Sequence, residues 1–211
     1  MTFSQNLHRL WTESRASSAQ EWGHSHFARG EYEASIRACD KAIRLNPQLI
    51  EAYNCRARAN FLLKNYDEAI TDLSRLIQQD KRRASAYLNR GIAYFAKGEI
   101  GDALGDMNMA IYLDPKQAIA YNHRGLVDEM MGNLTGAIAD YTKAIQLNPH
   151  IDAAYTNRGS ARAHRGDLHG AIADYKRYLA LGGGARHGNQ AQVERQIATL
   201  QRQLENDAHG L

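Results

Sequence analysis

The chain has 211 residues, of which 44% are hydrophobic and 23% charged, and its formal net charge is +3. This balance is typical of a globular protein with a buried core, and so weak a positive charge does not by itself indicate nucleic-acid binding. Two cysteines, Cys39 and Cys55, exclude a disulfide framework and predict a reduced, cytoplasmic protein. The first residues lack the apolar run of a signal peptide, and no stretch reaches the roughly 20 apolar residues of a membrane span. A leader removed from a longer precursor is left open.

Residues 1–15 are expected to form an N-terminal helical extension. Phe3, Leu7, Leu10 and Trp11 make a short apolar stripe at helical spacing. We favour packing of this stripe on the repeat that follows, since repeat arrays need capped ends. A segment for partner binding or self-association is the alternative.

A 34-residue period governs the chain from Ala16 onwards. Pro47, Pro115 and Pro149 fall at multiples of 34, and Lys81 occupies the vacant slot. The period defines five repeats: residues 16–49, 50–83, 84–117, 118–151 and 152–185.

Each repeat carries the same skeleton of aromatic, small and turn-forming residues. Position 4 is aromatic in the last four repeats, positions 8 and 20 are small in all five, and position 15 is glycine in four. The residues, in that order of positions, are Tyr53, Tyr87, Tyr121, Tyr155; Gly23, Ala57, Gly91, Gly125, Gly159; Ser35, Ala69, Ala103, Ala137, Ala171; and Gly30, Gly98, Gly132, Gly166. The pattern predicts two helices joined at a left-handed glycine, with small residues where the helices cross. One hairpin cannot bury both its faces, so neighbouring hairpins should stack.

This period and skeleton resemble the tetratricopeptide repeat (TPR) family over residues 16–185. The resemblance implies an all-α fold, a right-handed superhelical solenoid of antiparallel helix pairs. It also implies a concave groove, lined by the first helix of each pair, in which such proteins bind peptides or partner proteins.

The second repeat departs from the skeleton. Lys64 and Asn65 replace the turn glycine, and Lys81 replaces proline. We expect Asn65 to make this turn, or the turn geometry to change slightly.

An arginine at position 7 and an aspartate at position 23 occur together in repeats 2 to 5. The pairs are Arg56 and Asp72, Arg90 and Asp106, Arg124 and Asp140, and Arg158 and Asp174, whereas repeat 1 has Trp22 and Ala38. Because both charges are present or absent together, we expect each arginine to pair with an aspartate, in its own hairpin or in the preceding one. No nucleophile or metal ligand repeats beside them, which favours a structural role.

The C-terminal region is predicted to contain a hinge and a cap. Glycines 182–184 are expected to form a flexible hinge, and residues 186–206 a capping helix with Val193, Ile197, Leu200 and Leu204 on one stripe. Asn189 and Gln192 have the spacing of a capping box. Residues 207–211 are expected to be a flexible tail.

No constellation for catalysis is recognisable. Phosphate-binding and HExxH motifs are missing, and His24, His26, His164 and His169 lack the three or four converging ligands of a zinc site. We therefore predict a protein that is not an enzyme, with no cofactor and no metal.

The family geometry places a partner-binding surface on the first helices of repeats 2 to 5, and it puts Cys55 on the same side. Its centre is apolar, as expected of an interaction site, and asparagines within it can bond both groups of a peptide backbone. The predicted binding residues are Asn54, Arg58, Phe61, Leu62, Leu88, Asn89, Ile92, Phe95, Ile119, Asn122, His123, Leu126, Met130 and Asn157.

These residues predict a scaffold that binds a peptide or partner-protein segment, with no nucleic acid or membrane as ligand. Coverage of the groove by the chain's own termini, or by a second copy in a homo-oligomer, is the alternative. RNA binding is less favoured, because it requires a basic groove and a steep salt dependence.

The junction formed by residues 79–83 is expected to be the loosest between repeats, because it lacks the proline. Its backbone amides should exchange with solvent faster than those around Pro47, Pro115 and Pro149. Amide hydrogen exchange measured residue by residue checks this, and equal protection at all four junctions would contradict it.

Overall fold

The computed structural model describes the backbone of residues 3–209, together with the side chains of Gln5 and residues 10–208. In this part of the chain every regular element is an α-helix, which confirms the predicted all-α class. None of these helices has the length and apolarity that a membrane crossing requires.

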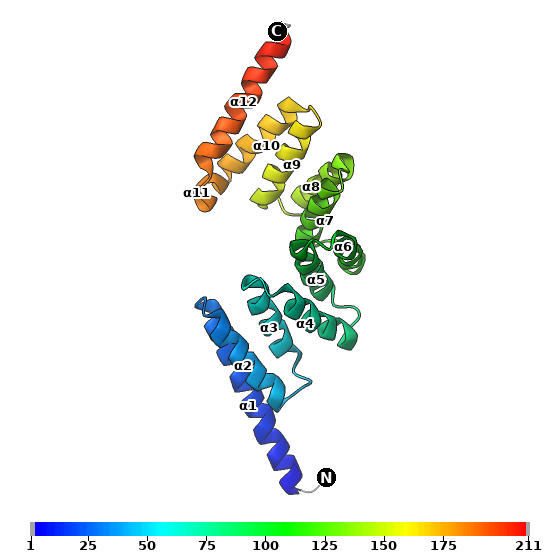
Figure 1. The fold of residues 1–211 in the computed structure, drawn as a ribbon, viewed down its shortest axis with the longest axis vertical. Helices are drawn as coiled ribbons and strands as arrows, with labels where there is room; N and C mark the ends of the chain where they lie inside the picture. The colour runs from blue at the N-terminus through cyan, green and yellow to red at the C-terminus, as the bar shows by residue number, and fades with distance from the viewer. Residues whose placement is uncertain (1–2, 210–211) are drawn as a thin grey trace. The chain divides into compact units, whose positions relative to one another are not determined.

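The helices fall into two compact lobes, Met1–Leu113 and Asp114–Leu211, and Figure 1 shows the helices of each. The first lobe contains α1 (Phe3–Ala28), α2 (Tyr32–Leu45), α3 (Ile50–Leu62), α4 (Tyr66–Gln79), α5 (Ala84–Lys97) and α6 (Ile100–Leu113). The second contains α7 (Ala118–Met130), α8 (Leu134–Leu147), α9 (Asp152–His164), α10 (Leu168–Ala180), α11 (Gly183–His187) and α12 (Gln190–His209).

Consecutive helices pair as hairpins within each lobe. α1 packs on α2, α3 on α4 and α5 on α6, and likewise α7 on α8 and α9 on α10. The second helix of a hairpin also packs on the first helix of the next, as α2 does on α3, α4 on α5 and α8 on α9. The stacking expected of a repeat array is therefore present inside each lobe.

The hairpin turns use the left-handed backbone conformation. The four turn glycines have φ between 77° and 89°, as predicted. In the second repeat the left-handed residue is Lys64, with φ 64°, whereas Asn65 has φ −80° and precedes α4. The expectation for Asn65 was wrong because the turn conformation belongs to the glycine slot, whichever side chain occupies it.

Position 8 of each first helix packs against position 24 of its own second helix. A Cβ added to Gly125 would lie 2.6 Å from the ring of Tyr141, and one added to Gly91 would lie 3.0 Å from the Met107 methyl group. Where the facing residue is Leu73, the small residue is Ala57, and both are buried in one cluster. The small residues therefore make room for large side chains on the partner helix.

The predicted arginine–aspartate pairs form within each hairpin. Arg90 Nε and Nη2 donate to Asp106 at 2.7 and 2.9 Å, and the other three pairs have the same two-bond geometry. Arg90 Nη1 reaches back to the hydroxyl of Ser74 on α4, the helix of the preceding hairpin, at 3.0 Å. One guanidinium thus joins three helices.

The junctions between hairpins share one turn. The side-chain oxygen of Asn46, Asp80, Asp114 or Asn148 accepts a hydrogen bond from the backbone N–H two residues later. Asp80, before Lys81, has φ −138° and ψ 97°, close to −140° and 94° at Asn46 before Pro47. Lys81 therefore keeps the geometry of the proline junctions, and the faster exchange expected there stays a prediction about dynamics.

The N-terminal extension is continuous with the first repeat. α1 runs without a break from Phe3 to Ala28, so the expected boundary between residues 15 and 16 lies inside one helix. Ala16 and Ala19 are buried, but Leu10 and Trp11 are 56% and 55% exposed. The expected packing of the apolar stripe is wrong for these two residues, and the side chains of Phe3 and Leu7 lie outside the described residues.

Of the three glycines after α10, Gly182 has a left-handed backbone with φ 75°, and the other two pack closely against neighbouring side chains. Gly183 and Gly184 are buried at the start of the short helix α11, and a Cβ on Gly183 would overlap the Tyr178 ring. His187 stacks on that ring and, with Arg186, holds Asp152 at the start of α9. The expectation of a flexible hinge missed this docking, which depends on contacts distant in sequence.

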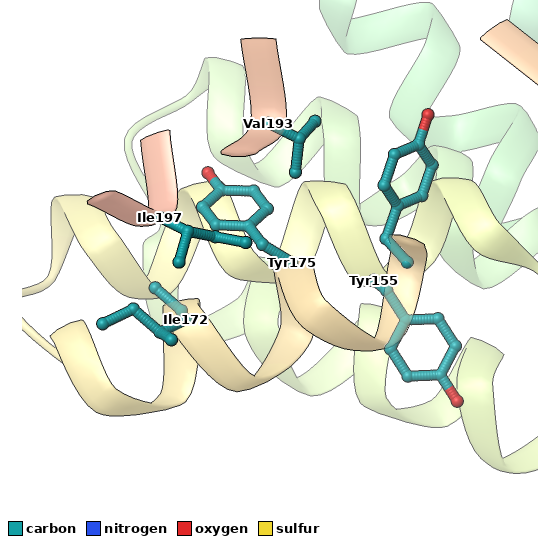
Figure 2. Close-up of a cluster of buried hydrophobic side chains, with 7 residues drawn as sticks. Tyr155, Ile172, Tyr175, Val193 and Ile197 are labelled. Atoms are coloured by element: carbon teal, nitrogen blue, oxygen red, sulfur yellow. The ribbon is translucent and has the colours of Figure 1, made fainter. Parts of the chain in front are cut away.

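α12 covers the last hairpin through its predicted stripe. Val193 and Ile197 are buried beside Ile172 and Tyr175, and Leu200 and Leu204 pack at the edge of the same cluster (Figure 2). The helix begins at Gln190 and continues through His209, so residues 207–209, expected in a flexible tail, are helical.

The expected capping box at the start of α12 is not formed by side chains. The carboxamide oxygen of Asn189 instead accepts the hydroxyl hydrogen bond of Tyr178 at 2.8 Å, while its backbone carbonyl receives the N–H of Val193.

Replacing Lys64 with glycine should stabilise the first lobe. A left-handed conformation costs a side-chain-bearing residue about 1–2 kcal/mol, and glycine adopts it freely. Allowing for the greater freedom of glycine in the unfolded chain, we expect Lys64→Gly to raise the free energy of unfolding by about 0.5–1 kcal/mol in urea denaturation. Lys143→Gly, in the middle of α8, should lower it by about 1 kcal/mol. A loss of stability with Lys64→Gly would contradict the assigned turn.

Breaking an arginine–aspartate pair should be costly. Asp106 is only 6% exposed, so Arg90→Met leaves a buried charge without its partner. We expect a loss of about 3 kcal/mol and a clear coupling energy in a double-mutant cycle with Asp106→Ala. The exposed pair of Lys97 and Asp67 is the control, with coupling below about 1 kcal/mol. Additive losses at Arg90 and Asp106 would refute the pairing.

Candidate partner-binding surface

An apolar hollow opens between the first helices of the first lobe. It has a volume of about 270 Å³ and is lined by residues of α1, α3, α4 and α5. Five of the predicted binding residues contribute to it: Arg58, Phe61, Leu62, Asn89 and Ile92. The remaining lining residues are Phe27, Ala57 and Leu73.

Aromatic rings and one guanidinium give the hollow its chemistry. The Arg58 guanidinium lies over the Phe27 ring, 4.2 Å from its centroid, which holds this cation in place at the rim. The Phe61 ring packs against Tyr66, with centroids 5.6 Å apart. Leu62 is 46% exposed, so an apolar side chain faces solvent here. The arrangement offers apolar contact area with a positive charge at its edge.

The other predicted residues of the first lobe lie outside this hollow. Leu88 is 5% exposed and belongs to the core, so its assignment to an open surface is corrected. Asn54 and Phe95 are half-buried on α3 and α5 but do not line the hollow. A helix turns 100° per residue, and a surface assigned from position numbers alone includes residues at the margin of the buried face.

In the second lobe the predicted asparagines bond to each other. Asn157 on α9 donates its amide to the oxygen of Asn122 on α7 at 3.1 Å, and Asn122 is 5% exposed. Asn122 was predicted to bind a peptide backbone, but in the structure it is not available for this. Its buried carboxamide links two first helices instead.

The remaining predicted residues on α7 have different environments. Ile119 and Met130 are 49% and 64% exposed, whereas Leu126 packs against the core around Ile138 and Tyr141. Burial lowers the pKa of His123, and its Nδ1 atom is buried without a hydrogen-bond partner among the described residues. His123 is thus a neutral side chain at neutral pH.

Cys55 is not on the groove side. It is 1% exposed and lies with Cys39, also buried and free, around Gly23, where a Cβ would be 2.5 Å from the Cys39 sulfur and 3.3 Å from the Cys55 sulfur. The sulfurs fill the space opposite a small residue, because α1, α2 and α3 meet there.

Of the three lining residues that were not predicted as binding residues, Ala57 and Leu73 belong to the buried core, whereas Phe27 could have been found from the sequence. It is position 12 of the first repeat, the position of Phe61 and Phe95 in the next two. The same rule that selected those residues would have found it, had the first repeat been included.

We also searched the described residues for groups of side chains that could bind a metal ion. In the described part of the chain, no three His, Cys, Asp or Glu side chains are grouped so that they could hold a metal ion. The features that the residues do assemble are packed hairpins and an apolar hollow with a charged rim.

Tandem helical hairpins with a 34-residue period, left-handed turns and small residues at positions 8 and 20 define a tetratricopeptide-repeat protein. The comparison with protein families agrees. The chain belongs to the ETO1 C-terminal domain family, whose model matches residues 24–198. No curated protein sequence matches the chain.

Many solved structures share the fold. MamA, known from a crystal structure, is 27% identical to this chain in sequence. The match covers 78% of this chain and 96% of the MamA chain, with a TM-score of 0.68. TTC0263, a thermophilic TPR protein of Thermus thermophilus, is 22% identical in sequence. The match covers 88% of this chain and 98% of the TTC0263 chain, with a TM-score of 0.69. PilF of Pseudomonas aeruginosa is 18% identical, covers 95% of each chain, and has a TM-score of 0.74. The last two likenesses concern the fold alone.

Proposed function

We propose that the protein is a non-catalytic scaffold that binds a segment of a partner protein in the hollow of its first lobe. The observation that carries the proposal is the convergence of Arg58, Phe61, Leu62, Asn89 and Ile92 with Phe27 in one open cavity. Exposed apolar side chains that gather in a concavity are typical of interaction sites.

The composition of the hollow selects the ligand. Phe61, Leu62 and Ile92 provide a surface for an apolar side chain, whose burial contributes about 25 cal/mol per Å². Arg58 is exposed and, held over Phe27, can pair with a carboxylate beside that side chain. Asn89 offers both a donor and an acceptor to a peptide group. A segment with an apolar residue next to an acidic one fits these groups.

A selection from a random peptide library tests the proposal. Peptides enriched on the wild-type protein should carry apolar and acidic residues and should bind at least tenfold more weakly to Leu62→Glu. A tenfold loss corresponds to about 1.4 kcal/mol, which one buried apolar contact with an unfavourable new charge readily accounts for. Fluorescence anisotropy of labelled peptides measures the affinities.

Met109→Glu is the matched control, because Met109 is also an exposed apolar residue, 39% exposed, but lies on α6 and outside the hollow. Equal affinity of the enriched peptides for wild type and Leu62→Glu would refute the proposed site. Far-ultraviolet circular dichroism should show the same helix content for all three proteins.

A further inference from the structure

A second hollow, on a different face of the first lobe, lies between α1 and α2. Its volume is about 440 Å³, and none of its lining residues is acidic. Three are cationic, Arg15, Arg37 and Lys41, and the indole of Trp22 stands among them with 69% of its surface exposed. The other lining residues are Ser18, Ala19, His26, Ala34 and Ala38.

The next repeat has a hollow at the same register, of about 430 Å³. Positions 7, 11, 19, 22 and 23 line both hollows. The later one has Arg56, Asn60, Glu68, Thr71 and Asp72 where the first has Trp22, His26, Ala34, Arg37 and Ala38.

The hollow of the second repeat shows which residues of the preceding hairpin lie beside these positions. α2, the second helix of the preceding hairpin, contributes Ile36 and Asp40 to it, and Arg56 donates to Asp40 at 2.6 Å. Ile36 and Asp40 are four residues apart and hence on one side of α2. At the second repeat, α2 therefore presents an apolar and an acidic residue, one helical turn apart, whereas the arginines of repeats 3 and 5 meet the hydroxyl groups of Ser74 and Thr142.

The first repeat offers the same place with a changed lining. Trp22 replaces the arginine, so an apolar surface stands where a charged fork binds in the second repeat. The carboxylates of positions 19 and 23 are replaced by the alanines Ala34 and Ala38, and cations occupy the surroundings. Tryptophan and arginine are enriched among the residues that contribute most to binding energy at protein interfaces.

Acidic side chains flank this hollow on both helices, and Glu33, four residues before Arg37, lies on the same side of α2 as that arginine. On the helical wheel Glu21 lies about 100° from Trp22 and Glu13 about 180°, away from the stripe that carries Arg15, Ser18 and Trp22. Glu31 is engaged with His26 and Arg29 at the far end. The lining of the hollow itself carries three cations, Arg15, Arg37 and Lys41, and no carboxylate.

We propose that this face binds an acidic amphipathic helix of a partner protein, laid along the hollow of α1 and α2 as α2 lies along the hollow lined by α3 and α4. Apolar residues of that helix cover Trp22 and the neighbouring alanines. Carboxylates one turn away pair with Arg37, Lys41 and Arg15. The site is separate from the hollow of Phe61 and Leu62, so each can fail without the other.

A displayed library of amphipathic helices, all with an apolar stripe and with either glutamate or lysine at the flanking positions, tests the proposal on the full chain. Glutamate-flanked helices should be enriched, and their affinity should fall with increasing salt. Trp22→Ala and the double change Arg37→Glu with Lys41→Glu should each weaken binding at least tenfold. In a Trp11→Phe background, Trp22 is the sole tryptophan, and its emission should shift to shorter wavelength on binding.

Leu62→Glu is the control and should leave this binding unchanged. Enrichment of lysine-flanked helices, enrichment of none, or equal binding to Trp22→Ala would overturn the proposal. So would sedimentation that shows a dimer of the wild-type chain abolished by Trp22→Ala, because a second copy would then occupy the face.

Discussion

The bidentate pairing of arginine and aspartate across each hairpin is the interaction on which the arrangement depends. A guanidinium has a third nitrogen free once its fork has bound a carboxylate, and in three of the repeats this nitrogen reaches a polar group on the preceding hairpin. A single side chain therefore sets both the closing of a hairpin and its register on its neighbour. The carboxylates are nearly buried, so the pair tolerates little displacement, since an unpaired buried charge is unfavourable.

The size match beside each fork complements this charge pairing. Position 8 lies next to the arginine and position 24 next to the aspartate, and both pairs are 16 residues apart. Glycine faces Tyr141, Tyr175, Met107 or Cys39, while alanine faces Leu73. Fork and close packing act on the same crossing of two helices, one fixing direction and the other distance.

The first repeat shows what happens to the surface when the fork is missing. With Trp22 and Ala38 at the two positions, Gly23 and Cys39 still pack closely, so the hairpin keeps its crossing. At the position where the other repeats carry the arginine, Trp22 is exposed in a hollow that is also lined by Arg15, Arg37 and Lys41. Where this internal contact is missing, the hollow between α1 and α2 has a different lining from the hollow on α3 and α5, with Trp22 and three cations and no carboxylate.

Spacings that recur every 34 residues were sufficient to predict the helices, their pairing and the association of each arginine with an aspartate. They left open whether that aspartate belongs to the same hairpin or to the preceding one, and the structure places it in the same hairpin. The family resemblance, through its groove positions, pointed to Arg58, Phe61 and Ile92, which line the hollow of the first lobe. The tertiary structure alone decided that Leu88 and Asn122 are buried, that Asn157 bonds to Asn122, and that glycines 183 and 184 dock a short helix on Tyr178. Such features arise between elements distant in the chain or at the edge of a buried face. There, a rotation of a few tens of degrees or the bulk of one neighbouring ring changes which atoms meet solvent, and no local pattern encodes that balance.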